Sequence, residues 1–192
     1  MDTETRTGIL GKRSDFARRP QDTYDTPPEA AAPLLPHLRP GEVFFEPCAG
    51  AGKLIDFLEM AGHRCVGAID IAPRDPRVAR GDALKVVGEC EWITNPPWDR
   101  KILHALLDHM RAIGVSGWLL LDANWAFTGQ AAEYMKYCDR VVVIGRVIWI
   151  PGTKMTGKDD CAWFHFVPQR ARWMRFFGKV GQVSRRSLGG AA

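Results

Sequence analysis

Residues 42–62 read EVFFEPCAGAGKLIDFLEMAG, and this stretch decides the fold class. Its first residues, 42–46, are largely aromatic or β-branched and predict a short strand that ends at Pro47. A glycine-rich turn follows, and residues 53–61 carry apolar side chains at helical spacing. A strand that passes through a glycine turn into a helix is typical of α/β sheets, which bind their ligands at the carboxyl ends of the strands.

The alternation of strands and helices continues along the chain. Pro33 and Pro36 should shorten or bend the first helix. No helix separates the last strands, which predicts an antiparallel hairpin edge on a mostly parallel sheet with helices on both faces. We expect further strands at 64–69, 91–94, 117–121, 141–150 (one or two strands) and 162–167, and helices at 30–38, 102–110 and 128–137.

Composition indicates one globular domain. The chain has 192 residues, 46% of them apolar and 25% charged, so it can bury a full core without disulfides or metals. The five cysteines are scattered without a CxxC pair, the histidines share no metal-binding spacing, and neither a signal peptide nor a membrane-spanning stretch is present. We therefore expect a cytoplasmic protein without metal or membrane partner, with a basic arm at 1–21, a main domain at 22–168 and a tail at 169–192.

The positive charge lies at the C-terminal end. The formal net charge is +4, and removing the six Lys or Arg of residues 168–192, which contain no acid, leaves −2 for residues 1–167. This tail can bind phosphates and stack bases on its aromatic residues, Trp173, Phe176 and Phe177. It can equally pack those aromatics on the core and leave its arginines in water, and the pattern favours neither. The arginines concerned are Arg170, Arg172 and Arg175.

The glycine turn has the position of a cofactor loop. A dinucleotide fingerprint would need a glycine at Ile55, and a phosphate loop would need one at Pro47 and a hydroxyl residue at Leu54, so both phosphate-binding patterns fail. The acid at Glu46 suits a cofactor that carries an ammonium and a sulfonium better than one with a pyrophosphate. Taken alone, the motif would be no more than a tight turn between strand and helix.

Two further acids follow at the ends of later sheet segments. Asp70 ends the next strand 24 positions after Glu46, where a carboxylate can accept the hydroxyls of a ribose. Asp82 precedes the strand after that, within reach of an adenine amino group. Each acid alone is typical of a cap or a solvated loop, but the three together with the glycines favour a nucleoside pocket.

The most specific motif is Asn95-Pro96-Pro97-Trp98, directly after an apolar strand. The prolines fix the backbone and remove two N–H donors, so the Asn95 carboxamide and the Pro96 carbonyl can both accept hydrogen bonds from one amino group. The nitrogen lone pair is then free to attack a methyl group in line, while Trp98 stacks on the planar substrate. The alternative is a helix N-terminus with prolines in its first turn and Asn95 as its cap.

Residues 22–167 resemble the Rossmann-like amino-group methyltransferases, in particular the compact DNA N6-adenine methyltransferases of phages and prophages. The resemblance implies a seven-stranded α/β domain and S-adenosylmethionine as cofactor. It places Asp70 on the ribose, Ile71 against the adenine face, and Asp82 with Ala83 on the adenine amino group. It places Asn95, Pro96, Pro97 and Trp98 at the catalytic centre. Around the rest of the cofactor it places Tyr24, Thr26, Pro27, Glu46, Pro47, Cys48, Gly50, Gly52 and Asn95.

The resemblance leaves the substrate open. DNA adenine is the leading target, but the tetrapeptide also occurs in enzymes that methylate RNA bases or protein glutamine. A catalytically weak cofactor-binding or nucleic-acid-binding protein is a further alternative. Residues 151–160 form a polar loop that can carry Lys154 and Lys158 to phosphates, or can be an ordinary surface hairpin. We expect nucleic acid as partner, and the sequence does not determine the oligomeric state.

Overall fold

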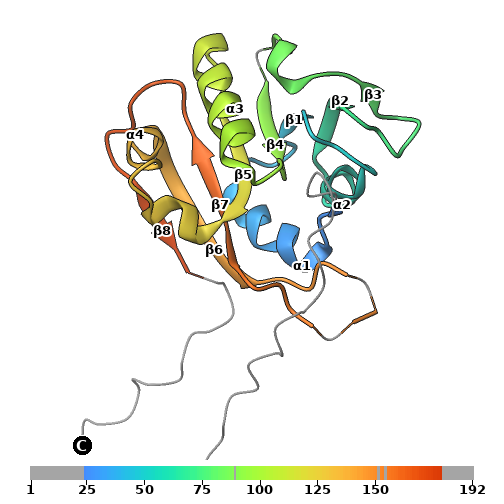
Figure 1. Cartoon of the computed structure of the whole chain (residues 1–192). Coiled ribbons are helices and arrows are strands. Elements are labelled where there is room, and N and C mark those ends of the chain that lie inside the picture. Colours follow the sequence, from blue (N-terminus) through green and yellow to red (C-terminus); the bar gives the residue numbers. More distant parts are fainter. Residues whose placement is uncertain (1–23, 89, 151, 154, 179–192) are drawn as a thin grey trace, which may run out of the picture.

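An eight-stranded sheet is the centre of the described part of the chain (Figure 1). The structure is a computed structural model that describes residues 24–88, 90–150, 152–153 and 155–178. The strand order is β3-β2-β1-β4-β5-β7-β6-β8. The strands are β1 (Val43–Glu46), β2 (Arg64–Asp70), β3 (Ala79–Arg80), β4 (Glu91–Thr94), β5 (Gly117–Asp122), β6 (Cys138–Arg146), β7 (Asp160–Phe166) and β8 (Arg175–Phe177).

The sheet confirms the predicted α/β class and corrects the predicted count of seven strands. β1 to β5 pair in parallel, whereas β7 is antiparallel to both of its neighbours, β5 and β6. β8 is the additional strand and pairs in parallel with β6, so the β6–β7 hairpin does not form the edge. β8 lies in the predicted tail, and its three residues are too few for a periodic pattern. The division into arm, domain and tail otherwise stays a prediction.

Short and long helices connect the strands. The predicted helix at 30–38 is a short α-helix, α1 (Pro28–Ala31), that continues as the 3-10 helix η2 (Ala32–His37), as the internal prolines require. The predicted helix at 128–137 is wrong in length, because Thr128 and Gly129 form a turn and α4 comprises only Ala132–Met135. The others are α2 (Lys53–Met60), η3 (Ala83–Lys85), α3 (Arg100–Ile113) and η4 (Ala123–Phe127).

The core has two parts, one on each face of the sheet. Side chains alternate along β5, so Trp118 and Leu120 join the part under α1, η2 and α2, while Leu119 and Leu121 join the part under α3. Burial of one such leucine contributes about 2 kcal/mol. No helix within the described ranges is long and apolar enough to span a bilayer.

Strand direction defines two edges that the site depends on. Glu46, Asp70, Thr94 and Asp122 are the last residues of parallel strands and lie at the carboxyl edge, the lower one in Figure 1. The opposite amino edge holds the starts of these strands. β7 runs the other way, so Phe166 pairs with Gly117 at the amino edge.

Candidate functional site

The glycine loop lies at the carboxyl edge between β1 and α2. Gly50 and Gly52 have φ angles of 53° and 70°, a region that strains other L-residues. A Cβ atom added to Gly50 would lie 2.9 Å from Nη2 of Arg74, so a larger residue here would also displace the end of that side chain. The predicted loop residue Pro47 is buried beneath the loop.

Asp70 holds the glycine loop in place. Its Oδ2 accepts a hydrogen bond from Gly50 N at 2.8 Å, and its Oδ1 accepts one from Ala72 N at 2.7 Å. A carboxylate has about four acceptor positions, so two of them stay available for hydroxyl groups of a ligand. Sequence reasoning predicted the ligand contact of Asp70 but missed this anchoring role.

Replacing Asp70 by alanine should destabilise the ligand-free protein by about 2 kcal/mol, because two charge-assisted hydrogen bonds are lost. The melting temperature should fall by roughly 4–8 °C in circular dichroism. Asp108→Ala on α3 is the control, since Asp108 is half exposed and pairs with Arg111. An equal effect of both substitutions would contradict the anchoring role.

The three predicted acids surround Cys48. Burial raises the pKa of the Cys48 thiol to about 12, and the carboxylates of Asp70, Glu46 and Asp82 contribute to this shift in that order. The thiol therefore stays protonated at neutral pH and is a poor nucleophile. These acids, distant in sequence, are therefore near enough to one another at the carboxyl edge to act electrostatically on the same thiol.

Glu46 is the most deeply buried of these acids, with 2% of its surface exposed. Burial, and to a smaller extent the charge of Asp70, raises the pKa of its carboxyl well above the usual range. Its Oε2 has no hydrogen-bond partner among the described residues. A buried carboxyl oxygen without a donor is costly, so the site suits a ligand that carries one, such as an ammonium.

Asp82 and Ile71 lie on the side of the site next to β3. Asp82 Oδ1 accepts a hydrogen bond from Leu84 N at 3.0 Å and caps η3, whose first residue is the half-buried Ala83. The capping interpretation therefore applies to Asp82. Ile71 follows β2 directly and is 66% exposed, which leaves it accessible to a flat apolar ligand group.

The tetrapeptide 95–98 lies between β4 and α3. The cap of α3 is Asp99, whose Oδ1 accepts hydrogen bonds from Lys101 N at 2.9 Å and Ile102 N at 3.2 Å. The alternative that Asn95 caps this helix is therefore wrong. Asn95 is half-buried at the end of β4, and Pro96 after it is buried.

Trp98 is fixed from two sides. Its Nε1 donates a hydrogen bond to the carbonyl oxygen of Leu120 at 2.9 Å, and Trp149 meets its ring edge to face at 5.7 Å between centroids. The ring of Trp149 in turn lies 6.1 Å from that of Tyr24. Sequence reasoning missed Trp149, because its contacts depend on how the segment after β6 folds back.

The segment that leads into α1 lies over the glycine loop. Arg74 donates to Asp25 at 2.7 Å across 49 positions of sequence, and Thr26 is buried, while Pro27 caps α1. Both partners of this ion pair are about two-fifths exposed, so it contributes under about 1 kcal/mol. The ion pair instead holds the segment before α1 against the loop after β2. Arg74 was not among the predicted site residues, although it follows Asp70 closely.

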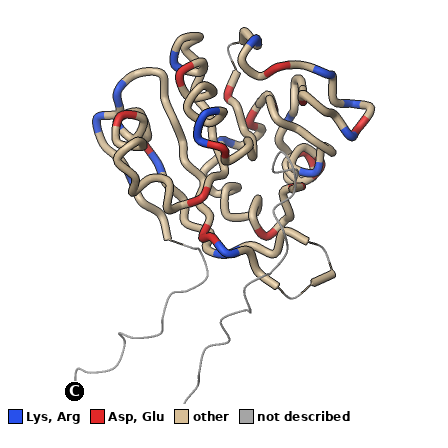
Figure 2. Tube along the Cα trace, viewed as in Figure 1, with Lys and Arg blue, Asp and Glu red and all other residues tan. Residues whose placement is uncertain are grey.

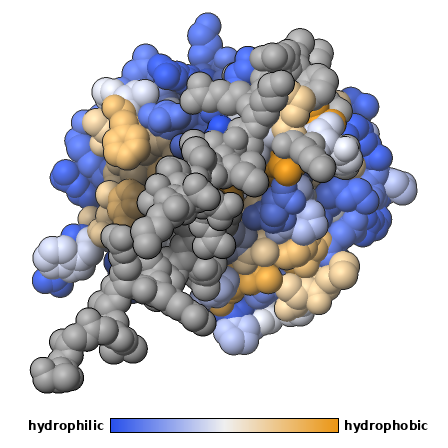
Figure 3. Space-filling view, turned by 90° about the horizontal axis from the view of Figure 1, so that it is seen from below, coloured by the Kyte–Doolittle hydropathy of each residue, from blue (hydrophilic) through white to orange (hydrophobic). Residues whose placement is uncertain are grey.

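The predicted nucleic-acid-binding residues that the structure describes lie at two opposite edges of the sheet. Lys158 is exposed between β6 and β7 at the carboxyl edge, which Figure 3 views from below as hydrophilic surface with apolar patches. Lys154 lies outside the described residues. The three arginines of the tail lie at the amino edge, away from the site. Within the described ranges, no group of three or more His, Cys, Asp or Glu side chains is arranged to hold a metal ion.

Solved structures share this arrangement of strands. Neither a protein-family model nor a curated protein sequence matches the chain. A candidate class I S-adenosylmethionine-dependent methyltransferase from Listeria monocytogenes is similar with a TM-score of 0.58 and 12% identity, over 83% of this chain and 67% of that one. The chain therefore has a Rossmann-like α/β fold similar to that of this structure.

Two other solved structures are similar over most of this chain. A candidate RNA methyltransferase from Pyrococcus horikoshii has a TM-score of 0.52 and 15% identity, over 80% of this chain and 91% of that one. The methyltransferase subunit of a type I restriction-modification system from Streptococcus thermophilus has a TM-score of 0.51 and 12% identity, over 77% of this chain and 45% of that one. This chain therefore spans less than half of the restriction-system subunit.

Proposed function

We propose that the protein is an S-adenosylmethionine-dependent methyltransferase that acts on an exocyclic amino nitrogen, with adenine N6 in DNA as the leading target. The observation that carries this proposal is the position of Asn95 outside the cap of α3. Asn95 stands at the carboxyl end of β4 and does not cap α3. That helix has its own N-cap, Asp99, four residues further along the chain. Similarity to the class I structures supports the proposal.

The residues at the carboxyl edge fit the proposed cofactor. The buried Oε2 of Glu46 suits the ammonium of the methionine part, and the free acceptor positions of Asp70 suit the ribose hydroxyls. In this proposal Ile71 would contact the adenine face and Asp82 the adenine amino group. When bound, S-adenosylmethionine supplies an electrophilic methyl group on a sulfonium.

The tetrapeptide would act by positioning. Asn95 Oδ1 and the Pro96 carbonyl would accept hydrogen bonds from the two amino hydrogens, which would turn the nitrogen lone pair out of the ring system and orient it for attack. Trp98 presents its ring as a fixed wall, because its N–H is already bound to Leu120. A base in a duplex reaches this point only when it is flipped out or already unpaired.

An RNA base is the second candidate substrate. The similarity to the Pyrococcus structure, a candidate RNA methyltransferase, covers 91% of that chain. Protein glutamine carries the same type of amino group, and it remains an alternative on chemical grounds alone. A catalytically weak binding protein is the alternative from a different class.

Purified protein should be incubated with methyl-labelled S-adenosylmethionine and, separately, with double-stranded DNA, single-stranded DNA, RNA and cell protein. After digestion, mass spectrometry identifies the labelled species. We expect label in N6-methyladenine from DNA. Label only in RNA or glutamine would change the substrate and keep the mechanism, while cofactor binding without any label would contradict the proposed activity.

A further inference from the structure

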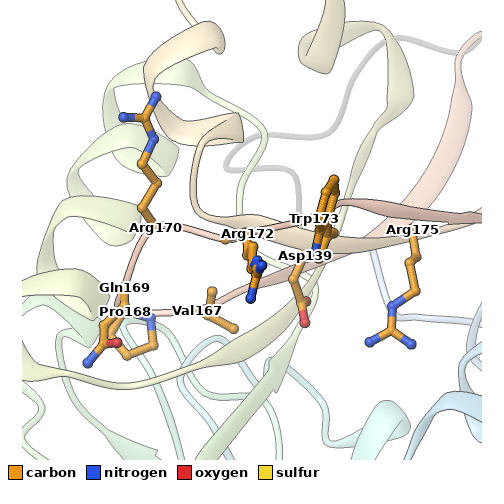
Figure 4. Close-up of a pocket in the computed structure, with 9 residues that line it drawn as sticks. Asp139, Val167, Pro168, Gln169, Arg170, Arg172, Trp173 and Arg175 are labelled. Carbon is orange, nitrogen blue, oxygen red and sulfur yellow. The ribbon is translucent and has the colours of Figure 1, made fainter.

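A second concave surface lies at the amino edge of the sheet, on the opposite side from the candidate site. It is a shallow, open hollow of about 710 Å³, formed by the loop between β7 and β8 together with the start of β6. Figure 4 shows Arg172 and Trp173 side by side near Asp139, with Arg170 and Arg175 on either side of them. We call this surface the arginine pocket.

The arginine pocket is preformed by backbone contacts. Val167 N donates to the Tyr137 carbonyl and Ala171 N to the Lys136 carbonyl, each at 2.9 Å. β8 fixes its other end, where Arg175 pairs with Arg140 of β6. Its walls therefore do not have to be ordered when a ligand binds, which avoids a cost in conformational entropy.

The charge of the arginine pocket is positive. Its one acid is Asp139, which contacts Nδ1 of His165 and Nε of Arg140. Burial acts to raise the pKa of Asp139, but the hydrogen bond from His165 and the charges of His165 and Arg140 outweigh it and lower the pKa. The carboxylate is thus ionised but already neutralised by its partners. Arg170, Arg172 and Arg175 are exposed, and Figure 2 shows basic positions along this loop at the left of the molecule.

The arginine pocket also presents an aromatic ring to solvent. Trp173 is 73% exposed, and the guanidinium carbon of Arg172 lies 5.8 Å from its ring centroid. Phe177, by contrast, is half-buried and its ring packs 4.5 Å from that of His37. Both alternatives for the tail therefore apply, but to different residues. Phe177 packs on the core, whereas the ring of Trp173 remains accessible for stacking.

We propose that the arginine pocket binds single-stranded nucleic acid, with phosphates at its arginines and one base stacked on Trp173. Arginines beside an exposed aromatic ring are the combination that binds single strands without reading sequence. β5 alone separates the two edges by roughly 20 Å, so the strand that binds here is a distal part of the polymer. That this polymer also carries the methylated base rests on the proposed function.

The test is equilibrium binding of the full chain to a fluorescent 20-residue homothymidine strand at several salt concentrations. Thymine has no exocyclic amino group, so this ligand probes the arginine pocket independently of methyl transfer. Trp173→Ala should weaken binding about tenfold and leave the salt dependence unchanged, since stacking carries no charge. Arg172→Gln should lower the slope of log K against log salt by about 0.7, the value for one phosphate contact.

Arg64→Gln is the matched control. Arg64 is exposed and begins β2, so it stands at the same amino edge, with four strands between β2 and β6. This control removes the same charge and should leave both affinity and slope unchanged. Melting temperatures verify that each variant is folded.

Equal binding by wild type, Trp173→Ala and Arg172→Gln would overturn the inference. So would equally tight binding of polyglutamate that is insensitive to Trp173→Ala, because the surface would then attract any polyanion. A protein that binds homothymidine through the arginine pocket but methylates no polymer would keep this inference and contradict the proposed function.

Discussion

Replacing Asn95 by alanine should lower the rate of methyl transfer about 1,000-fold and leave the affinity for S-adenosylmethionine within about threefold. The substitution removes one of two acceptors that orient the amino group, and loss of a single preorganised hydrogen-bonding group at a reaction centre costs a factor of about 10² to 10³. Single-turnover methylation measures the rate, and calorimetry measures cofactor affinity.

Asn124→Ala is the matched control for Asn95→Ala. Asn124 lies in η4 just after β5, at the same carboxyl edge, and its amide nitrogen donates to Asp122 at 3.1 Å. We expect this variant to keep the wild-type rate within about twofold, the range typical of a surface substitution. An Asn95→Ala enzyme that retained full activity would show that another group orients the nucleophile.

Replacing Glu46 by glutamine should raise the stability of the free protein and lower its affinity for the cofactor. In the free protein, glutamine removes a carboxyl whose pKa is raised because burial disfavours its charged form, so the variant should be more stable near neutral pH. In the bound protein it removes the charged partner of the ammonium. A hydrogen bond to a charged group contributes about 1.5–3 kcal/mol, so cofactor affinity should fall roughly 10- to 150-fold.

The pH dependence distinguishes this effect from a packing change. The pKa of Glu46 is raised in the folded state. Its contribution to the stability of the fold is therefore fully present below the unfolded pKa of about 4.3 and is lost as pH rises through the folded-state pKa. The stabilities of wild type and Glu46→Gln should therefore coincide near pH 4. Above that pH, the free energy of unfolding of the variant should exceed that of wild type by up to about 1.4 kcal/mol per pH unit, until the folded-state pKa of Glu46 is reached. Denaturant unfolding at several pH values measures this difference.

Cofactor binding supplies a second test of Glu46. An ammonium placed against Oε2 favours the carboxylate, so wild-type protein should release a proton when it binds S-adenosylmethionine. Calorimetry in two buffers with different ionisation enthalpies detects that release. Glu133→Gln, a substitution of an exposed glutamate on α4, should leave the proton release intact. Binding without proton release would contradict the assigned role of Glu46.

The local parts of the site were predictable because each is contiguous in sequence. The strand, glycine turn and helix of residues 43–60 agree closely with prediction, since hydrophobic period and turn chemistry act within a short window. The convergence of Glu46, Asp70 and Asp82 was also predictable, because parallel strands bring their carboxyl ends to one edge.

Other features depend on contacts between distant segments. The ion pair of Arg74 with Asp25 and the contacts of Trp149 with Tyr24 and Trp98 require the folded chain, and no pattern in the sequence precedes them. The role of Asn95 was ambiguous for a different reason. Both an active-site asparagine and a helix cap are followed by prolines, and only the observed cap at Asp99 distinguishes them.

The pairing of β8 with β6 has a consequence for the solubility of the protein. Without β8, the outer backbone donors and acceptors of β6 would be open, and such a strand invites pairing with other chains and aggregation. The same three-residue strand carries Arg175 of the arginine pocket. Loss of the C-terminal segment would therefore remove polymer binding and protection against self-association together, so a truncated chain is a poor tool for separating the two.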